Sequence, residues 1–285
     1  MKTSNHLLRR LTAALLAAVL ALSIALPVFA SDDGDTIYIN SVSDLLSLAR
    51  NCAYDQWSVG KTVILQKDLS LEGMLWEPIP SFSGQFKGSG HTISDLTITG
   101  QYSPAGLFGI VEEQGSIESL SVRGVVSVSD SADTTTGGIA GINHGTLISC
   151  QFTGVVTGDS EVGGIVGRNE SEGTIDHSTA RAIVTGKSST GGIAGYNLGA
   201  ITGCTNVGSI NTEYPEASLD TDGFTAKMVD YINNKMAAAN DDATNSVTNV
   251  ATDTGGIAGR SSGMILTSVN TGTVGYEHIG YNVGG

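Results

Sequence analysis

The stretch GGIAGINHGTLISCQ, residues 137–151, decides how this chain folds. Its glycine-rich head has two interpretations: a phosphate-binding loop that opens a helix, or a corner between short strands. Apolar residues at alternate positions follow the glycines, and a period of two is typical of a strand. The stretch also recurs along the chain, which a single ligand loop does not explain. The sequence therefore favours the structural corner.

The glycine motif returns as GGIVG at 163–167 and as GGIAG at 191–195 and 255–259, with a degenerate copy, AGLFG, at 105–109. Later positions agree as well. One aliphatic position is occupied in successive copies by Ile117, Leu147, Ile175, Ile201 and Ile265. A position three residues further on is occupied by Leu120, Cys150, Ser178, Cys204 and Ser268. Such repeats predict a solenoid in which equivalent residues of neighbouring coils stack on one another.

Each copy of about 26 residues contains three short alternating segments separated by glycine or Asn-Gly turns. This pattern predicts an all-β fold, a parallel β-helix of three-strand coils about 4.8 Å apart. Asn143, Asn169 and Asn197 share one register, as expected for an asparagine turn ladder in left-handed backbone geometry. We expect the glycines to lie at sharp turns or close approaches, and alanine to be least tolerated where φ is positive.

Residues 1–30 have the pattern of a secretory signal peptide. Lys2, Arg9 and Arg10 precede an uncharged apolar run, and Val28-Phe29-Ala30 predicts cleavage after Ala30. The expected location is therefore secreted or on the extracellular cell surface, with no membrane span after cleavage. The remaining chain has 11 basic and 28 acidic residues, a net charge of −17. Without a basic stripe, nucleic acid is excluded as a partner.

Residues 31–60 are expected to form an N-terminal helical cap, with Ser41 or Ser43 as the N-cap and Leu45 and Leu48 on the apolar side. The β-helix is then predicted over 61–285. An insertion at about 211–252 interrupts it and carries a candidate helix at 222–240, which we expect to pack on the coils or, alternatively, to bind a partner. The C-terminus ends in mid-repeat, so we expect either a continuation of the chain or end-to-end association at this open coil.

The cysteines and histidines do not form a recognisable reactive site. Three cysteines, Cys52, Cys150 and Cys204, are an odd number for a disulfide framework. Cys150 and Cys204 stand two coils apart, ~9.6 Å, beyond the roughly 7 Å limit for a disulfide. We expect buried thiols, and we expect His91 and His144 to be solvated turn residues. No cofactor and no metal site is predicted.

One pair of carboxylates has a spacing near that of a catalytic site. Glu118 and Asp176 share a register two coils apart, at ~9.6 Å, near the outer limit of the roughly 6.5–9.5 Å used by inverting glycosidases. Ile148 lies between them, and no basic or aromatic side chain joins that face. The sequence therefore predicts no catalytic residue, and a carbohydrate-active lyase or glycosidase is kept as an alternative.

Taken together, GGIAGINHGTLISCQFTGVVTG, GGIVGRNESEGTIDHSTARAIVTG, GGIAGYNLGAITGCTNVGSI and GGIAGRSSGMILTSVNTGTV resemble the GLUG-motif family of secreted bacterial surface proteins. The resemblance implies a right-handed β-helix at the cell surface, often within a large adhesin-like protein. Similar repeats occur in IgA1-specific zinc metalloproteases outside the catalytic domain, but this chain has no His-Glu-x-x-His and protease activity is not carried over.

The expected function is accordingly that of a non-enzymatic exported scaffold: a stalk, an adhesin-like protein or an interaction module. Its expected partner is a host or cell-surface protein or glycan. A second alternative is the N-terminal, non-catalytic part of a larger secreted protease-like protein.

Overall fold

The structure is a computed structural model that describes residues 35–54, 56–128, 134–212, 252–275 and 281–284. Residues 1–34 and 213–251, in which the signal peptide and the inserted helix are predicted, lie outside the described residues. In the part of the chain that is described, no helix has both the length and the apolar character needed to cross a membrane.

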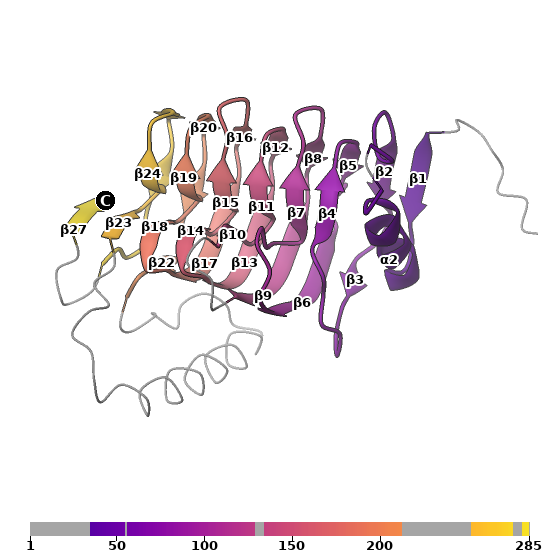
Figure 1. Ribbon diagram of the computed structural model, residues 1–285, viewed down its shortest axis with the longest axis horizontal. Helices are drawn as coiled ribbons and strands as arrows, with labels where there is room; N and C mark the ends of the chain where they lie inside the picture. Colours follow the sequence, from indigo (N-terminus) through magenta and orange to yellow (C-terminus); the bar gives the residue numbers. More distant parts are fainter. Residues whose placement is uncertain (1–34, 55, 129–133, 213–251, 276–280, 285) are drawn as a thin grey trace, which may run out of the picture. The chain divides into compact units, whose positions relative to one another are not determined.

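The described chain is a parallel β-solenoid, so the predicted fold class is confirmed (Figure 1). Four sheets run along it, and neighbouring strands in each come from successive coils. Sheet A contains β1 (Thr36–Ile39), β2 (Thr62–Leu65), β5 (Gln85–Lys87), β8 (Ser116–Glu118), β12 (Thr146–Ile148), β16 (Thr174–Asp176), β20 (Ala200–Thr202) and β25 (Met264–Leu266). Sheet B contains β3 (Leu69–Ser70), β6 (Thr92–Gly100), β9 (Ser121–Val128), β13 (Gln151–Thr157), β17 (Thr179–Thr185), β21 (Thr205–Asn206) and β26 (Val269–Asn270), and β22 (Ser209–Ile210) also pairs with β17.

The other two sheets complete each coil. Sheet C contains β4 (Ile79–Phe82), β7 (Phe108–Val111), β11 (Ala140–Asn143), β15 (Val166–Asn169), β19 (Ala194–Asn197) and β24 (Ala258–Ser261). Sheet D contains β10 (Thr136–Gly137), β14 (Ser160–Gly163), β18 (Ser188–Gly191), β23 (Thr252–Gly255) and β27 (Tyr281–Gly284).

A complete coil has four strands where the sequence indicates three. The chain passes in order through sheets C, A, B and D, as in β11, β12, β13 and β14. The difference arises at the glycine motif, which the alternating apolar pattern predicts to be a single strand. In the structure Gly163 ends a strand of sheet D, the chain bends at Gly164 and Ile165, and Val166 begins a strand of sheet C. The two glycines thus mark a corner between strands.

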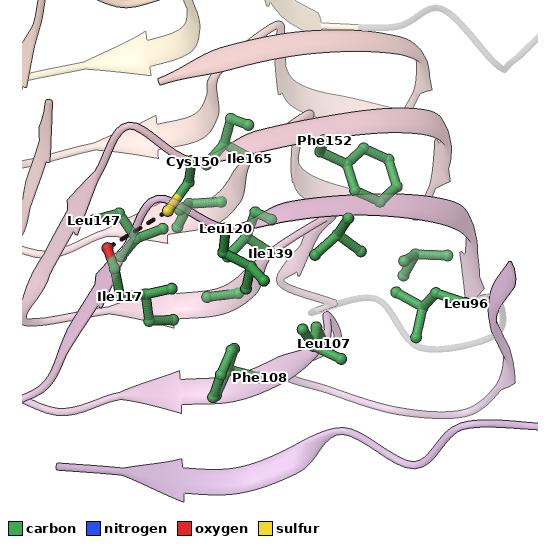
Figure 2. Packing of buried hydrophobic residues seen from close by; sticks show 14 of the residues in the cluster. Leu96, Leu107, Phe108, Ile117, Leu120, Ile139, Leu147, Cys150, Phe152 and Ile165 are labelled. Carbon is green, nitrogen blue, oxygen red and sulfur yellow. Dashed lines mark hydrogen bonds between the residues drawn. The ribbon is translucent and has the colours of Figure 1, made fainter. Parts of the chain in front are cut away.

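The registers inferred from the repeats are those of the structure. Leu147 pairs with Ile117 on one side and with Ile175 on the other. Ile175 pairs in turn with Ile201, and these four side chains are fully buried. Figure 2 shows Ile117, Leu147 and Leu120 pointing into the same interior as Ile139 and Phe152. The core is therefore built from ladders of equivalent residues.

The segment that lengthens one repeat lies between two strands of the same coil. Ile210, in β22, pairs with Val184 of the preceding coil, and Thr252, in β23, pairs with Ser188 of that same coil. Val184 and Ser188 are only four residues apart. The stacking register is therefore resumed after the intervening residues. In the last described coil Ile265 is 38% exposed, whereas its neighbour Ile201 is fully buried.

The asparagine ladder differs from the expectation, because its side chains point inward. Asn143, Asn169 and Asn197 are fully buried at the ends of strands in sheet C. Asn143 Nδ2 donates to Asn169 Oδ1 at 2.8 Å, and Asn169 Nδ2 donates to Asn197 Oδ1, also at 2.8 Å. Left-handed backbone occurs in other registers instead, such as that of Ser119, Ser149 and His177. The prediction of left-handed asparagines was wrong: the side-chain amides bond from coil to coil.

Most glycines of the repeats are required by close approach and not by positive φ. A Cβ on Gly145 would lie 2.1 Å from the carbonyl oxygen of Gly115 in the preceding coil. Gly73, in contrast, has a φ of +76° and no atom within 4 Å of its Cβ position. In the stacked registers the neighbouring backbone fills the space, so steric overlap adds to any cost that alanine has from backbone strain.

Helix α2 (Val42–Asn51) lies at the N-terminal side of the first coils and contacts β1 and β4. Ser41 is its N-cap, and the Ser41 hydroxyl accepts a hydrogen bond from the Asp44 amide. Leu45 and Leu48 are buried in the same core as the strands. The Asp44 carboxylate accepts from the Asn40 amide at 3.0 Å. This hydrogen bond, followed by one from the Ser41 side chain to the same carboxylate, holds the pKa of Asp44 below its usual value.

Candidate functional site

Glu118 and Asp176, the candidate catalytic pair, lie in one ladder of sheet A. Ile148 pairs with Glu118 on one side and with Asp176 on the other, so the two acids are separated by a full coil. Glu118 is exposed, and Asp176 contacts the neighbouring His177 Nδ1 at 2.8 Å. Neither residue lines the two grooves described below.

The three cysteines are buried free thiols. The Cys150 thiol donates to the carbonyl oxygen of Ile117 at 3.4 Å, as the dashed line in Figure 2 shows. Burial raises the pKa of Cys150 to about 12 and that of Cys204 to about 11. Because a nucleophilic cysteine requires a thiolate, these residues serve as small core side chains.

His91 lies in a turn, as expected, because its amide donates to the Gly88 carbonyl at 2.9 Å, and its side chain is 35% exposed. It is half-buried, and its Nδ1 lies 3.1 Å from Asp68 Oδ1, a partner 23 residues earlier in the chain. His144 is also half-buried. Across the described ranges, no group of three or more His, Cys, Asp or Glu side chains is arranged to hold a metal ion.

Beside His91, a groove of about 350 Å³ lies over the outer face of sheet B. We call it the Arg123 groove; it is lined by Asp68, Leu69, Ser70, Thr92, Ser94 and Arg123. Asp68 directly precedes β3, and the other residues come from β3, β6 and β9, which are neighbours in the sheet. Their polar side chains combine a carboxylate, three hydroxyls and a guanidinium, whereas the Leu69 side chain is buried in the core.

A backbone irregularity shapes the groove. The pairing of β6 with β9 shifts register between Ile93 and Leu96, and Asp95 within this bulge has a φ of +60°. Bulges of this kind redirect side chains. The Asp95 carboxylate consequently accepts hydrogen bonds from Ser70 Oγ at 2.7 Å and Ser94 Oγ at 2.8 Å. The two serine hydroxyls that line the groove are thereby held in place.

The electrostatics of the groove are mixed. Asp68 Oδ1 accepts the Thr92 amide at 2.9 Å, and this hydrogen bond, followed by that of His91, lowers the pKa of Asp68. Asp68 is therefore a carboxylate at neutral pH, and Arg123 brings a positive charge to the same hollow.

A second groove, of about 430 Å³, lies between the loop after α2 and sheet C. It is lined by Gln56, Val59, Ser81, Ser83, Glu112, Glu113 and Gln114. The Ser81 hydroxyl donates to Glu112 Oε1 at 2.7 Å and fixes that carboxylate. This hollow is polar and acidic, and no basic residue is among those that line it.

Sheet C also carries a row of outward side chains from successive coils. Arg168, Tyr196 and Arg260 are in register, and both guanidinium groups lie over the Tyr196 ring, at 5.4 and 5.5 Å from its centroid. Arg168 is held by ion pairs with Glu161 and Glu170. Such contacts reinforce the stacking of coils at the surface.

Neither the groove around Arg123 nor the Arg–Tyr row is predicted from the sequence. Asp68, Thr92 and Arg123 are far apart in the chain and belong to early coils without the full glycine motif. The repeats align inward residues, which are alike from coil to coil. The outward positions differ between coils. The only sequence signal for the Arg–Tyr row is the repeat register, which places Arg168, Tyr196 and Arg260 at equivalent positions.

A family model, the GLUG motif, matches residues 158–185. The chain contains a GLUG motif. The matched residues include β14, β15, β16 and β17, so the GLUG motif corresponds to one complete coil of the solenoid.

Two further proteins are similar to this chain. Halomucin of Haloquadratum walsbyi is 31% identical over 155 residues, which are 50% of this chain and 2% of halomucin. The chain thus spans a very small part of that relative. The crystal structure of a protein from Bacteroides ovatus described as a candidate immunoglobulin A1 protease aligns with a TM-score of 0.55 and 18% identity, over 88% of this chain and 75% of that chain. This second likeness shows the fold alone.

Proposed function

We propose that this chain is an exported β-helix scaffold that acts at the cell surface as an adhesin-like interaction module. The observation that carries the proposal is the division between inward and outward residues. Leu147 and Ile175 fill the same core ladder, whereas their outward neighbours Ile148 and Asp176 differ in character. A regular core therefore supports an outer surface that varies from coil to coil, a property of solenoid binding proteins.

The comparisons support the same proposal. The GLUG motif occupies a full coil, and the resemblance to halomucin and to a β-helix structure suggests a surface or secreted protein. The partner in this proposal is a host or cell-surface protein or glycan. Hydroxyls, charges and an aromatic residue in the two grooves and the Arg–Tyr row provide the groups that recognise such a partner.

An adhesion assay tests the proposal. Beads coupled to the purified chain are applied to bacterial and animal cell layers, and retention under flow is compared with that of beads carrying an unrelated acidic protein of equal charge. We expect specific retention that soluble chain competes away. Retention equal to the control on every layer would overturn the adhesive role.

A further inference from the structure

The outer face of sheet B carries an apolar ladder that points away from the core. In β13 and β17, Val156 and Val184 pair with each other and belong to the buried core cluster. Because side chains alternate along a strand, Val155 and Ile183 point outward, and neither belongs to that cluster. Val125 of β9 pairs with Val155 and continues the row. We call Val125, Val155 and Ile183 the outer ladder.

The outer ladder is covered at one end. Val155 is 3% exposed and Ile183 is 6% exposed, whereas Val125 is only half-buried. Ser209, which pairs with Ile183 in the next coil, is also 6% exposed. Strands flank all of these residues, so neighbours within the sheet do not explain why Val155 is covered more than Val125. The helix of the described residues, α2, contacts β1 and β4 in the first coils and does not explain it either.

Residues 213–251 leave and rejoin the solenoid beside the covered end. The strand before them, β22, pairs with β17, and the strand after them, β23, pairs with β18 of the same coil. Asn211 Nδ2 donates to Thr254 Oγ1 at 3.0 Å, and Asn211 Oδ1 accepts from the Gly186 amide at 2.9 Å. Asn211 and Thr254 are both buried, so these hydrogen bonds hold the two ends of the segment together within the coil that contains Ile183.

The length and pattern of this segment suit the outer ladder. The helix predicted at 222–240 has apolar residues at helical spacing on one side: Phe224, Met228, Tyr231, Ile232 and Met236. A helix of that length spans about 28 Å. The row from Val125 to Ser209 takes three coil-to-coil steps, about 14 Å at ~4.8 Å per step. Residues 213–221 reach up to about 30 Å when extended, so the helix can reach every position of the row.

We propose that residues 213–251 pack on the outer face of sheet B, with the apolar side of the helix at 222–240 against Val155 and Ile183. An amphipathic helix is stabilised by burying its apolar side, and an outward row of valine and isoleucine provides a matching surface. Because the segment is tethered beside this surface, its effective concentration there exceeds that of a free partner. This interface goes beyond the proposed adhesive role, since it removes the covered part of sheet B from the surfaces that meet a partner.

Disulfide trapping in the purified chain tests the contact. Ile183→Cys is combined in turn with Met228→Cys and with Ile232→Cys, both on the apolar side of the predicted helix. The matched control combines Ile183→Cys with Asn233→Cys, because Asn233 follows Ile232 in the sequence but lies on the polar side of that helix. A second control combines Ile232→Cys with Thr202→Cys, since Thr202 points outward from sheet A. A cooperative thermal melt before oxidation verifies that each variant is folded.

We expect an intramolecular disulfide from Ile183→Cys to at least one apolar-side cysteine, with a yield at least about fivefold above both controls, because a disulfide requires Cα atoms within about 7 Å. Equal trapping at Asn233→Cys, or none at either apolar-side position, would overturn the proposal. Disulfides that link two chains in place of the intramolecular one would also overturn it, because a second copy would then be the occupant of the ladder.

A deletion tests the same contact without new cysteines. Residues 213–251 are replaced by a short Gly-Ser linker, which the hydrogen bond between Asn211 and Thr254 allows. Fluorescence of the apolar dye anilinonaphthalene sulfonate should rise at least about threefold, because the outer ladder becomes an exposed apolar patch. Adding Val155→Thr and Ile183→Thr to the deletion should return the fluorescence to the parent level. Unchanged fluorescence after the deletion, or a rise that the two threonines do not reverse, would contradict the proposal.

Discussion

Replacing Asn169 by alanine tests the buried asparagine ladder. Asn169 lies in the middle of the ladder, accepting from Asn143 Nδ2 and donating to Asn197 Oδ1, each at 2.8 Å, and also donating to the Gly173 carbonyl at 3.1 Å. The substitution leaves a donor of Asn143 and the acceptor of Asn197 unpaired in a fully buried position. At about 1–3 kcal/mol for each unsatisfied buried group, the expected loss of unfolding free energy is about 2–6 kcal/mol.

The assay is urea unfolding of the purified chain, followed by far-ultraviolet circular dichroism, with the shift in midpoint converted through the common slope. The matched control is Ser261→Ala at the exposed end of the same ladder, where Ser261 accepts a single 3.1 Å hydrogen bond from Asn197. This change should cost less than about 1 kcal/mol because water replaces the lost partner. If Asn169→Ala costs no more than Ser261→Ala, the ladder does not stabilise the solenoid as argued.

Three further predictions concern other parts of the chain. Gly145→Ala should lower the free energy of unfolding by more than about 2 kcal/mol, because its Cβ would meet the Gly115 carbonyl. Gly73→Ala should lower it by about 1–2 kcal/mol, from backbone strain alone. Thermal melts compare the two variants, and a larger loss for Gly73→Ala would contradict the close-approach argument. The pKa of Asp44 is lowered in the folded chain, so its contribution to stability is fully present above the usual pKa of 3.8 and is lost as the pH falls below that value. The melting temperature of Asp44→Asn should therefore depend less on pH below about 4 than that of the parent chain. Parallel curves of melting temperature against pH would refute this. Finally, Cys150, whose pKa is raised to about 12, should not react with Ellman's reagent at pH 8 until urea unfolds the chain, and rapid labelling of this residue in the native protein would show that its ladder is open.

The repeat predicts the fold because each inward position must match its neighbour in the next coil. Ile117, Leu147 and Ile175 share one environment, and the sequence records this as similar residues at similar spacing. The direction of Asn143 could not be predicted in the same way, since an asparagine repeated in register suits either a turn or a buried amide ladder. The hydrogen bond from Asn143 to Asn169 follows from the stacking of the coils, which the residue type alone does not predict.

The candidate site was harder to predict than the fold. The Arg123 groove depends on a bulge at Asp95 and on neighbours brought together from Asp68, Thr92 and Arg123. No spacing rule links these residues, because the early coils vary in length before the regular repeats begin. The pairing of His91 with Asp68 was missed for the same reason.

Deleting one whole coil tests most directly whether the GLUG motif is a modular unit of a stacked scaffold. Removing residues 158–185 joins Thr157 to Gly186 and preserves every register, because Ser160 and Ser188 are ladder partners. The shortened chain should fold as a monomer with a cooperative melt, because each coil contacts only its neighbours. Removing only residues 158–171 shifts the registers and should abolish folding. A whole-coil deletion that is unfolded or aggregated, or one that behaves no better than the half-coil deletion, would contradict the account.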